Sequence, residues 1–203
     1  MGSHRQPGIF APDQTSVLLA GVGGQGILLA SNILARTALL AGFDVKTNEV
    51  HGMAQRGGSV VAEIRFGKKI HSPLIPPLGA QVLAAFEAME ALRYAGFLSS
   101  GGQALISTLR IIPTSVSSGF AAYPRDLDTV LRKTFRNVRF VDAAAAARKA
   151  GSPKAINMAI LGAVSSVLAF EDSIWQKAIG LCVKAKFVET NLQAFAFGKK
   201  LAA

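Results

Sequence analysis

Gly21-Val22-Gly23-Gly24-Gln25-Gly26 decides the fold of this chain, because it joins a short apolar run to a long apolar helical pattern. Residues 16–20 have the length and apolar character of a buried parallel strand, and residues 27–40 predict a helix that ends near Gly42. Glycines in such a turn allow a phosphate to approach the backbone, and the helix N-terminus supplies N–H donors. A tight turn that packs only against protein would look the same, so both interpretations stay open. The candidate cofactor-binding residues are Gly21, Gly23, Gly24, Gln25 and Gly26.

A second polar and glycine-rich stretch, Glu49-Val50-His51-Gly52-Met53-Ala54-Gln55-Arg56-Gly57-Gly58-Ser59, follows after about one βαβ unit. Glu49 has the spacing from the glycine turn of the acidic residue that binds a ribose in dinucleotide-binding domains, which makes such a domain one alternative. Arg56 offers a planar fork for a carboxylate or phosphate, and Gly57-Gly58 can turn N–H groups toward the same anion. A structural loop whose polar groups satisfy one another is the other alternative. The candidate anion-binding, substrate-binding or interface residues are Glu49, His51, Met53, Gln55, Arg56, Gly57, Gly58 and Ser59.

The order of the remaining elements predicts a three-layer α/β fold. Alternating apolar and polar residues at 59–66 predict a half-exposed strand, which Gly67-Lys68-Lys69 turns into a short hairpin partner at 70–72. Further strands are expected at 45–50, 82–86, 104–108 and 138–141, and further helices at 87–95, 125–135 and 143–151. The fold class is therefore a Rossmann-like sandwich with a mostly parallel sheet, a β-hairpin insertion and C-terminal helices.

Residues 15–203 are expected to form a single domain, preceded by a flexible tail at 1–14. Its last part, about 153–200, is helical: Ser152-Pro153 starts one helix, and others follow at 172–184 and 186–197. The chain has 203 residues, enough for one such domain with a core.

Composition limits the function classes. Charged residues make up only 17% of the chain, which suggests that a partner covers apolar surface. The net charge of +10 fits a basic surface with no single partner, or attraction to anionic ligands such as coenzyme A, a 2-oxoacid or an acidic ferredoxin. Nucleic acid is disfavoured because the basic residues form few clusters and none is interleaved with aromatic residues. A single cysteine, Cys182, excludes an internal disulfide and a four-cysteine iron–sulfur cluster. No catalytic residue emerges, and three scattered histidines give no metal signature.

No targeting segment is visible either. The N-terminus lacks the apolar core of a signal peptide, and no run of about 18 apolar residues predicts a membrane span. A cytoplasmic location, without membrane attachment, is the expectation.

Several stretches resemble the gamma-type module of the 2-oxoacid:ferredoxin oxidoreductases, in particular its indolepyruvate type. Beside the two glycine-rich motifs, the similar stretches are Ser72–Pro76, Glu90–Tyr94, Val141–Ala143, Asn157–Ala163 and Lys186–Phe195. The resemblance covers about residues 15–200. The glycine turn alone is weakly specific, whereas the His51–Gly58 motif together with the Ser72–Pro76 turn is strongly specific.

The resemblance implies a non-autonomous subunit of an oxidoreductase that oxidatively decarboxylates an aryl 2-oxoacid to an acyl-coenzyme A. Thiamine diphosphate and iron–sulfur clusters would lie on a large subunit, electrons would pass to ferredoxin, and this chain would hold no cofactor firmly. The expected partners are that large subunit, ferredoxin through the complex, and a second copy of the chain when it is alone. A free-standing dinucleotide-binding domain is the competing interpretation.

Overall fold

The computed structural model describes residues 14–51, 58–112, 124 and 126–202. Six strands form one sheet in the order β2-β3-β1-β4-β5-β6. The strands are β1 (Gln14–Val22), β2 (Asp44–His51), β3 (Ser59–Gly67), β4 (Ala80–Ala85), β5 (Leu98–Ser107) and β6 (Val138–Val141). β1, β4, β5 and β6 run parallel, whereas β3 is antiparallel to both β1 and β2. The mostly parallel α/β sheet is confirmed.

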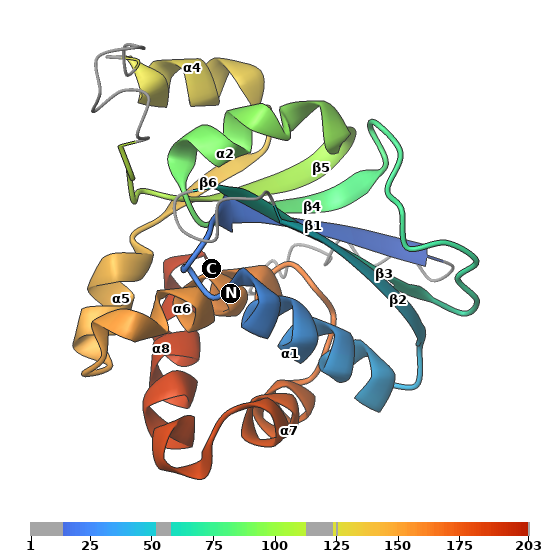
Figure 1. The fold of residues 1–203 in the computed structure, drawn as a ribbon, viewed down its shortest axis with the longest axis vertical. Coiled ribbons are helices and arrows are strands. Elements are labelled where there is room, and N and C mark those ends of the chain that lie inside the picture. The colour runs from blue at the N-terminus through green and yellow to red at the C-terminus, as the bar shows by residue number, and fades with distance from the viewer. Residues whose placement is uncertain (1–13, 52–57, 113–123, 125, 203) are drawn as a thin grey trace, which may run out of the picture.

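Helices cover both faces of this sheet, which confirms the three layers (Figure 1). α2 (Ala88–Arg93) and α4 (Leu127–Thr134) lie on one face. The other face is covered by α1 (Ile27–Leu40), α5 (Ala143–Lys149), α6 (Ile156–Ser165), α7 (Asp172–Cys182) and α8 (Val188–Leu201). α1 has the bounds that its apolar pattern predicts. The helix α5 begins after Asp142, whose carboxylate accepts a hydrogen bond from the N–H of Ala145 at 2.9 Å.

One hydrophobic core joins the sheet to the C-terminal helices. It includes Val17 of β1 and Ile33 of α1 as well as Trp175 of α7, all with no exposed side-chain surface. The rings of Phe170 and Trp175 are 5.8 Å apart, and Trp175 lies 5.5 Å from Phe195 of α8. We therefore propose that residues 15–203 fold as one domain; the prediction of a flexible tail falls almost wholly outside the described residues.

Two helices of the C-terminal part approach each other at glycines. A Cβ on Gly162 of α6 would lie 2.0 Å from the carbonyl oxygen of Phe195. A Cβ on Gly198 of α8 would lie 1.9 Å from the carbonyl oxygen of Ala159. The missing side chains let the two backbones touch, and this contact positions the start of α6 behind the glycine turn.

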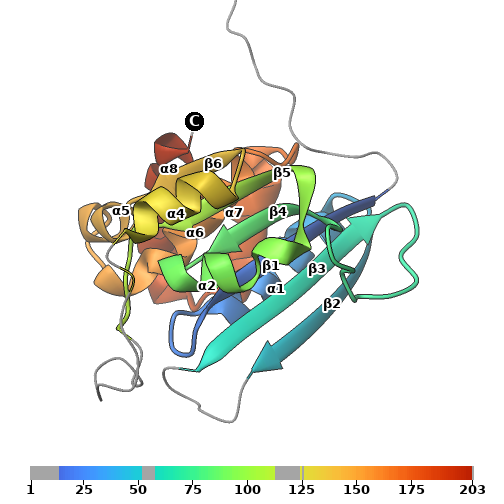
Figure 2. The ribbon, with the colours of Figure 1, turned by 90° about the horizontal axis from the view of Figure 1, so that it is seen from above.

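The expected strand at 70–72 is wrong, and so is the half-exposed character of 59–66. β3 pairs instead with β2 and β1, and Figure 2 shows β2 at the edge of the sheet. Val61 and Glu63 are buried, each only 8% exposed, because the segment after β3 covers this face: Val61 belongs to a hydrophobic cluster with Ile75, and Glu63 accepts a hydrogen bond from the N–H of Ile75. The segment after β3 crosses over the Glu63 face of the sheet without pairing as a strand.

Two expectations for helices need smaller corrections. The helix expected at 125–135 is α4, which spans Leu127–Thr134. The helix expected to be buried all round, α1, keeps a stripe of exposed residues, with Leu28 40% and Leu39 52% exposed. Sheet, α6 and α7 cover the rest of α1, so the stripe is the part that faces away from all three.

Candidate functional site

The glycine turn lies at the topological switch point of the sheet. β1 and β4 are parallel neighbours, and the helices that follow them, α1 and α2, lie on opposite faces of the sheet (Figure 1). Ligands of open α/β sheets bind at such a point, outside the carboxyl ends of the strands. The sequence therefore placed its first motif at the position where this class of fold offers a ligand site.

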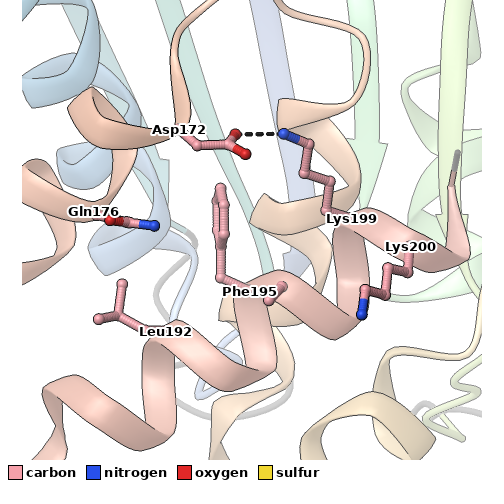
Figure 3. A pocket seen from close by; sticks show the side chains of 7 residues that line it. Asp172, Gln176, Leu192, Phe195, Lys199 and Lys200 are labelled. Carbon is pink, nitrogen blue, oxygen red and sulfur yellow. Dashed lines mark hydrogen bonds and ion pairs between the residues drawn. The ribbon is translucent and has the colours of Figure 1, made fainter.

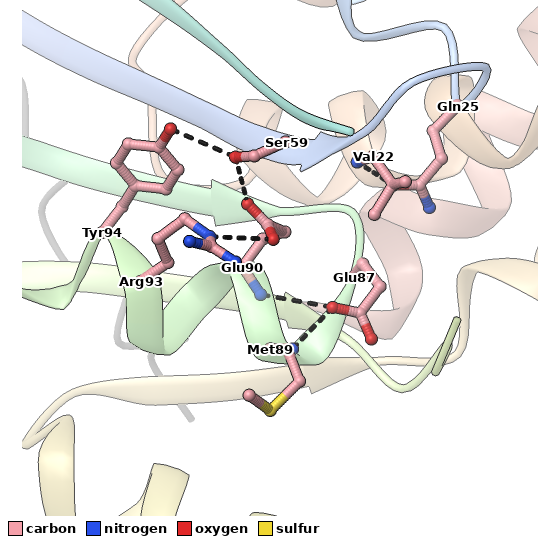
Figure 4. A network of polar contacts seen from close by, with 8 residues as sticks. All are labelled: Val22, Gln25, Ser59, Glu87, Met89, Glu90, Arg93 and Tyr94. Atoms are coloured by element: carbon pink, nitrogen blue, oxygen red, sulfur yellow. Dashed lines mark hydrogen bonds and ion pairs between the residues drawn. The ribbon is translucent and has the colours of Figure 1, made fainter. Parts of the chain in front are cut away.

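Gln25 bridges the two strand ends at this point. Its Oε1 accepts a hydrogen bond from the N–H of Val22 at 2.7 Å, and its Nε2 donates to the carbonyl oxygen of Phe86 at 2.8 Å. Figure 4 shows the Gln25 side chain turned back toward Val22. The amide that could have faced a ligand is engaged by the protein itself.

Two glycines of the turn are explained by contacts within the chain. A Cβ on Gly21 would lie 2.7 Å from Oε1 of Gln25, so Gly21 makes room for the bridging amide. Gly26, the N-cap of α1, has φ 76° and faces Asn157, whose Nδ2 donates to the Gly26 carbonyl at 3.2 Å. Gly24 differs: it has φ 99°, and a Cβ there would meet no described atom within 4 Å. Gly24 thus has a surface that is open to a ligand.

The end of the second motif lies directly against the first. The N–H of Gly23 donates to the carbonyl oxygen of Gly58 at 2.8 Å, and Ser59 pairs with Val22 across β3 and β1. Glu49 lies on β2, half-buried, while His51 ends that strand. The fold thus brings Gly23 of the first motif against Gly58 of the second, 35 positions further along the sequence.

Ser59 is held by a polar network from α2 (Figure 4). Its Oγ donates to Oε2 of Glu90 at 2.5 Å and lies 3.2 Å from the hydroxyl of Tyr94. Arg93 Nε donates to the other oxygen of Glu90 at 3.0 Å. Glu90 is only 5% exposed, so its charge is held by these hydrogen bonds rather than by water. The network fixes the point at which the second motif enters the sheet.

The first turn of α2 is held in the same way. Glu87, 1% exposed, accepts hydrogen bonds from the N–H groups of Met89 at 2.7 Å and of Glu90 at 3.2 Å. Its second oxygen accepts from the N–H of Ile111 at 3.1 Å. Glu87 is therefore the N-cap of α2, where the sequence placed it inside the first turn.

Met53, Gln55, Arg56 and Gly57 lie outside the described residues, as does the side chain of His51. Their role in binding an anion therefore stays a prediction. The sequence interpretation missed Glu90, Tyr94 and Asn157 as members of this region. Each belongs to a stretch that carried the family resemblance, so the resemblance was the signal that could have marked these residues as part of the site.

The cysteine content does not fit a four-cysteine iron–sulfur cluster, and the described part of the chain shows no other metal site. Cys182 is the single cysteine, and the described residues contain no group of three or more His, Cys, Asp and Glu side chains placed to bind a metal ion. None of the described helices is long and apolar enough to cross a membrane.

A groove of about 360 Å³ lies between α7 and α8 (Figure 3). Its lining includes the apolar Leu192 and Phe195, and also Lys199 and Asp172, which form an ion pair. None of its lining residues belongs to either motif, so it does not extend the candidate site.

Comparisons with known proteins agree with this geometry. Residues 16–201 match the family described as pyruvate ferredoxin/flavodoxin oxidoreductase. The indolepyruvate oxidoreductase subunit IorB of Archaeoglobus fulgidus is 44% identical, over 90% of this chain and 92% of that protein. The gamma subunit of a keto/oxoacid ferredoxin oxidoreductase from Geobacter sulfurreducens has a similar fold, with a TM-score of 0.69, 21% identity, and coverage of 93% and 98% of the two chains.

A third neighbour is a longer chain. The 2-oxoglutarate:ferredoxin oxidoreductase of Magnetococcus marinus has a TM-score of 0.71 and 19% identity; the match covers 95% of this chain but 31% of that one. This fold therefore also occurs as one part of a larger polypeptide.

The fold and the match over almost the whole sequence define the class: this chain belongs to the pyruvate ferredoxin/flavodoxin oxidoreductase family. Within it, the curated relatives at 33% identity or more are indolepyruvate oxidoreductase subunits. The resemblance stated from sequence is confirmed, and so is the assignment to a subunit of an oxidoreductase complex.

Proposed function

We propose that this chain is the small subunit of an indolepyruvate-type 2-oxoacid:ferredoxin oxidoreductase. The observation that carries the proposal is the match to the IorB subunits, which extends over nine tenths of both chains. In this proposal the chain supports the decarboxylation of an aryl 2-oxoacid, while the redox centres lie on its partner subunit. We further propose that the complex lies in the cytoplasm and delivers its electrons to ferredoxin.

The cofactors of the reaction belong to the large subunit in this proposal. Thiamine diphosphate would supply the carbanion chemistry at the 2-oxoacid carbonyl, and iron–sulfur clusters would carry the electrons. One cysteine is too few to hold a cluster in this chain, which supports their placement on the partner. Coenzyme A would be the acceptor of the acyl group.

The contribution of this chain is proposed to be an anion site at the carboxyl end of β1. Gly24 is open, the N-terminus of α1 points its N–H groups to the same side, and Gly58 and Ser59 are fixed beside it. The proposed site also includes Arg56, because its planar guanidinium can bind a carboxylate or phosphate and it directly precedes Gly57-Gly58 in the sequence. Gly24→Ala should raise the KM for coenzyme A or the 2-oxoacid in the assembled enzyme, because it adds a methyl group where the ligand would approach the backbone.

The dinucleotide-binding alternative is not favoured by the geometry. Glu49 is half-buried on β2, and β3 separates that strand from β1. In a dinucleotide-binding domain the acidic residue would stand at the end of the strand next to β1.

Reconstitution tests the proposed function. The purified chain, the purified large subunit and their mixture are each assayed for reduction of a viologen with indolepyruvate, coenzyme A and thiamine diphosphate. The chain alone is expected to be inactive, and the mixture active. Turnover by the chain alone, or tight binding of NAD together with failure to bind the large subunit, would contradict the proposal.

A further inference from the structure

A buried carboxylate on α2, that of Glu90, has no role yet in the proposed function. Glu90 is 5% exposed, and an ionised carboxylate is costly to bury unless hydrogen bonds replace its water. Two side chains supply them, since Ser59 Oγ donates to Oε2 at 2.5 Å and Arg93 Nε donates to Oε1 at 3.0 Å. Packing of α2 on the sheet needs no charge, as the buried Ala88 and Ala91 of the same helix show. The carboxylate therefore does something that packing does not require.

Two contacts link Glu90 to the glycine turn. Its partner Ser59 is the residue directly after Gly58. The carbonyl oxygen of Gly58 accepts a hydrogen bond from the N–H of Gly23 at 2.8 Å. Gly23 directly precedes Gly24, on which a Cβ would meet no described atom within 4 Å. A displacement of Ser59 would therefore reach the open backbone of the turn through a single hydrogen-bonded peptide.

The other end of this link is rigid because α2 is anchored to the sheet. Ala88 and Ala91 are buried in one hydrophobic cluster with Ala20 of β1. Tyr94, directly after α2, brings its hydroxyl within 3.2 Å of Ser59 Oγ, so the serine is held from two sides (Figure 4). The position of Ser59 is thus set by a helix that packs on the same strand that leads into the glycine turn.

The charge of Glu90 would by itself work against an anion site. A carboxylate repels a carboxylate or phosphate bound nearby, and the Arg93 side chain that offsets this repulsion is 60% exposed to water. If Glu90 acts through its charge, removing that charge should strengthen anion binding. If Glu90 acts by holding Ser59, the same change should weaken anion binding. The two roles therefore predict effects of opposite sign.

We propose that Glu90 is a positioning residue for the anion site at the glycine turn: through Ser59 it holds Gly58, and with it the backbone beside Gly24. The inference rests on the proposed function, which places a carboxylate or phosphate of the 2-oxoacid or of coenzyme A at this turn. Glu90 acts on affinity without contact to the anion, because preorganised donors bind more tightly than donors that the ligand must first order.

The test measures kcat and the KM values for coenzyme A and indolepyruvate in the assembled enzyme, with Glu90→Gln, Ser59→Ala and the double variant. Each single variant should raise one of the two KM values about tenfold and leave kcat within about twofold; a misplacement of about 1 Å can cost up to about a hundredfold. The double variant should raise that KM no further, because both changes break the same link. The ligand whose KM rises identifies the anion that binds at the turn.

Glu63→Gln is the matched control. Glu63 is also a buried carboxylate, 8% exposed, and lies on β3 as Ser59 does. Its oxygens accept hydrogen bonds from Asn48 Nδ2 at 2.7 Å and from the N–H of Ile75 at 2.8 Å, so it has no link to the turn through these contacts. The control should lower the melting temperature and leave both KM values unchanged. A general loss of stability that raised KM would appear in this variant as well.

The outcomes separate this inference from the proposed function. If the wild-type complex is inactive, the proposed function fails. If the wild type is active and Glu90→Gln lowers KM, the carboxylate acts through its charge and the positioning role is refuted. Unchanged KM values in both single variants, additive effects in the double variant, or an equal rise in Glu63→Gln would also refute it. If Glu90→Gln does not assemble, Ser59→Ala, which removes only a hydroxyl group, decides by the same KM.

Discussion

Replacing Gln25 with alanine tests whether the glycine turn is held by protein or waits for a ligand. The change removes an acceptor from the N–H of Val22 and a donor from the carbonyl oxygen of Phe86, at 2.7 and 2.8 Å. Each hydrogen bond contributes about 1 kcal/mol net, and each partner left without a bond costs about 1–3 kcal/mol more when water cannot reach it. Gln25 is half-buried, so partial access of water reduces this penalty. We expect Gln25→Ala to lower the free energy of unfolding by about 2–4 kcal/mol.

The assay is urea unfolding of the isolated chain, supported by a thermal melt. For a chain of this size the expected loss corresponds to a fall in melting temperature of roughly 4–16 °C. Gln25→Glu keeps an acceptor for Val22 but cannot donate to Phe86, so it should also destabilise the chain. Gln193→Ala is the control, since that amide is exposed on α8 and donates to Glu189 one turn away. It should change stability by less than about 0.5 kcal/mol.

One result would refute this reasoning. If Gln25→Ala unfolds at the same urea concentration as the wild type, while the assembled enzyme loses affinity for coenzyme A or the 2-oxoacid, the amide binds a ligand. The bridge between β1 and β4 would then be incidental, and the dinucleotide-like interpretation of the turn would regain support.

Two further predictions concern packing and pH. Gly198→Ala should destabilise the chain by about 3 kcal/mol, because the new Cβ would lie 1.9 Å from the carbonyl oxygen of Ala159. Gly180→Ala is the control: its Cβ meets open space within α7, so it should stabilise the chain by about 0.5–1 kcal/mol. Thermal melts and urea unfolding measure both. The N–H of Ile70 lowers the pKa of the Asp44 carboxyl, so its ionised form stabilises the fold above the ordinary carboxyl pKa, and this contribution is lost as pH falls through the lowered value. Asp44→Asn should therefore flatten the decline of the urea midpoint below about pH 4, and an unchanged decline would contradict this assignment.

Local patterns predicted the elements because their causes are local. The apolar periodicity between Gly26 and Gly42 determines α1, whose observed bounds match the prediction. Asp142 before an alanine run indicates a capped helix, and the cap is present. Hydrogen bonds within a helix and its cap join residues a few positions apart, so nearby side chains suffice to specify them.

The sequence was less informative where one element meets another. Alternation at 59–66 correctly indicated a strand, but half-exposure was wrong because alternation cannot show that a later segment, at Ile75, covers the second face of β3. The Pro-rich turn after β3 was recognised as a motif, yet its anchoring by Glu63 and Arg65 appears only when the loop is folded back on the strand.

The sequence by itself determined the family, the α/β class, most helices and strands, and the position of the first motif between strand and helix. The tertiary structure decided what those motif residues do. Gln25 meets Phe86, 61 positions away, and Asn157 meets Gly26, 131 positions away. No periodicity within a short window encodes such contacts, because they depend on strand order and on the close approach of helices at Gly162 and Gly198. For this reason Gly21 and Gly26, two glycines that looked like a phosphate cradle, serve packing, while Gly24 keeps an open face.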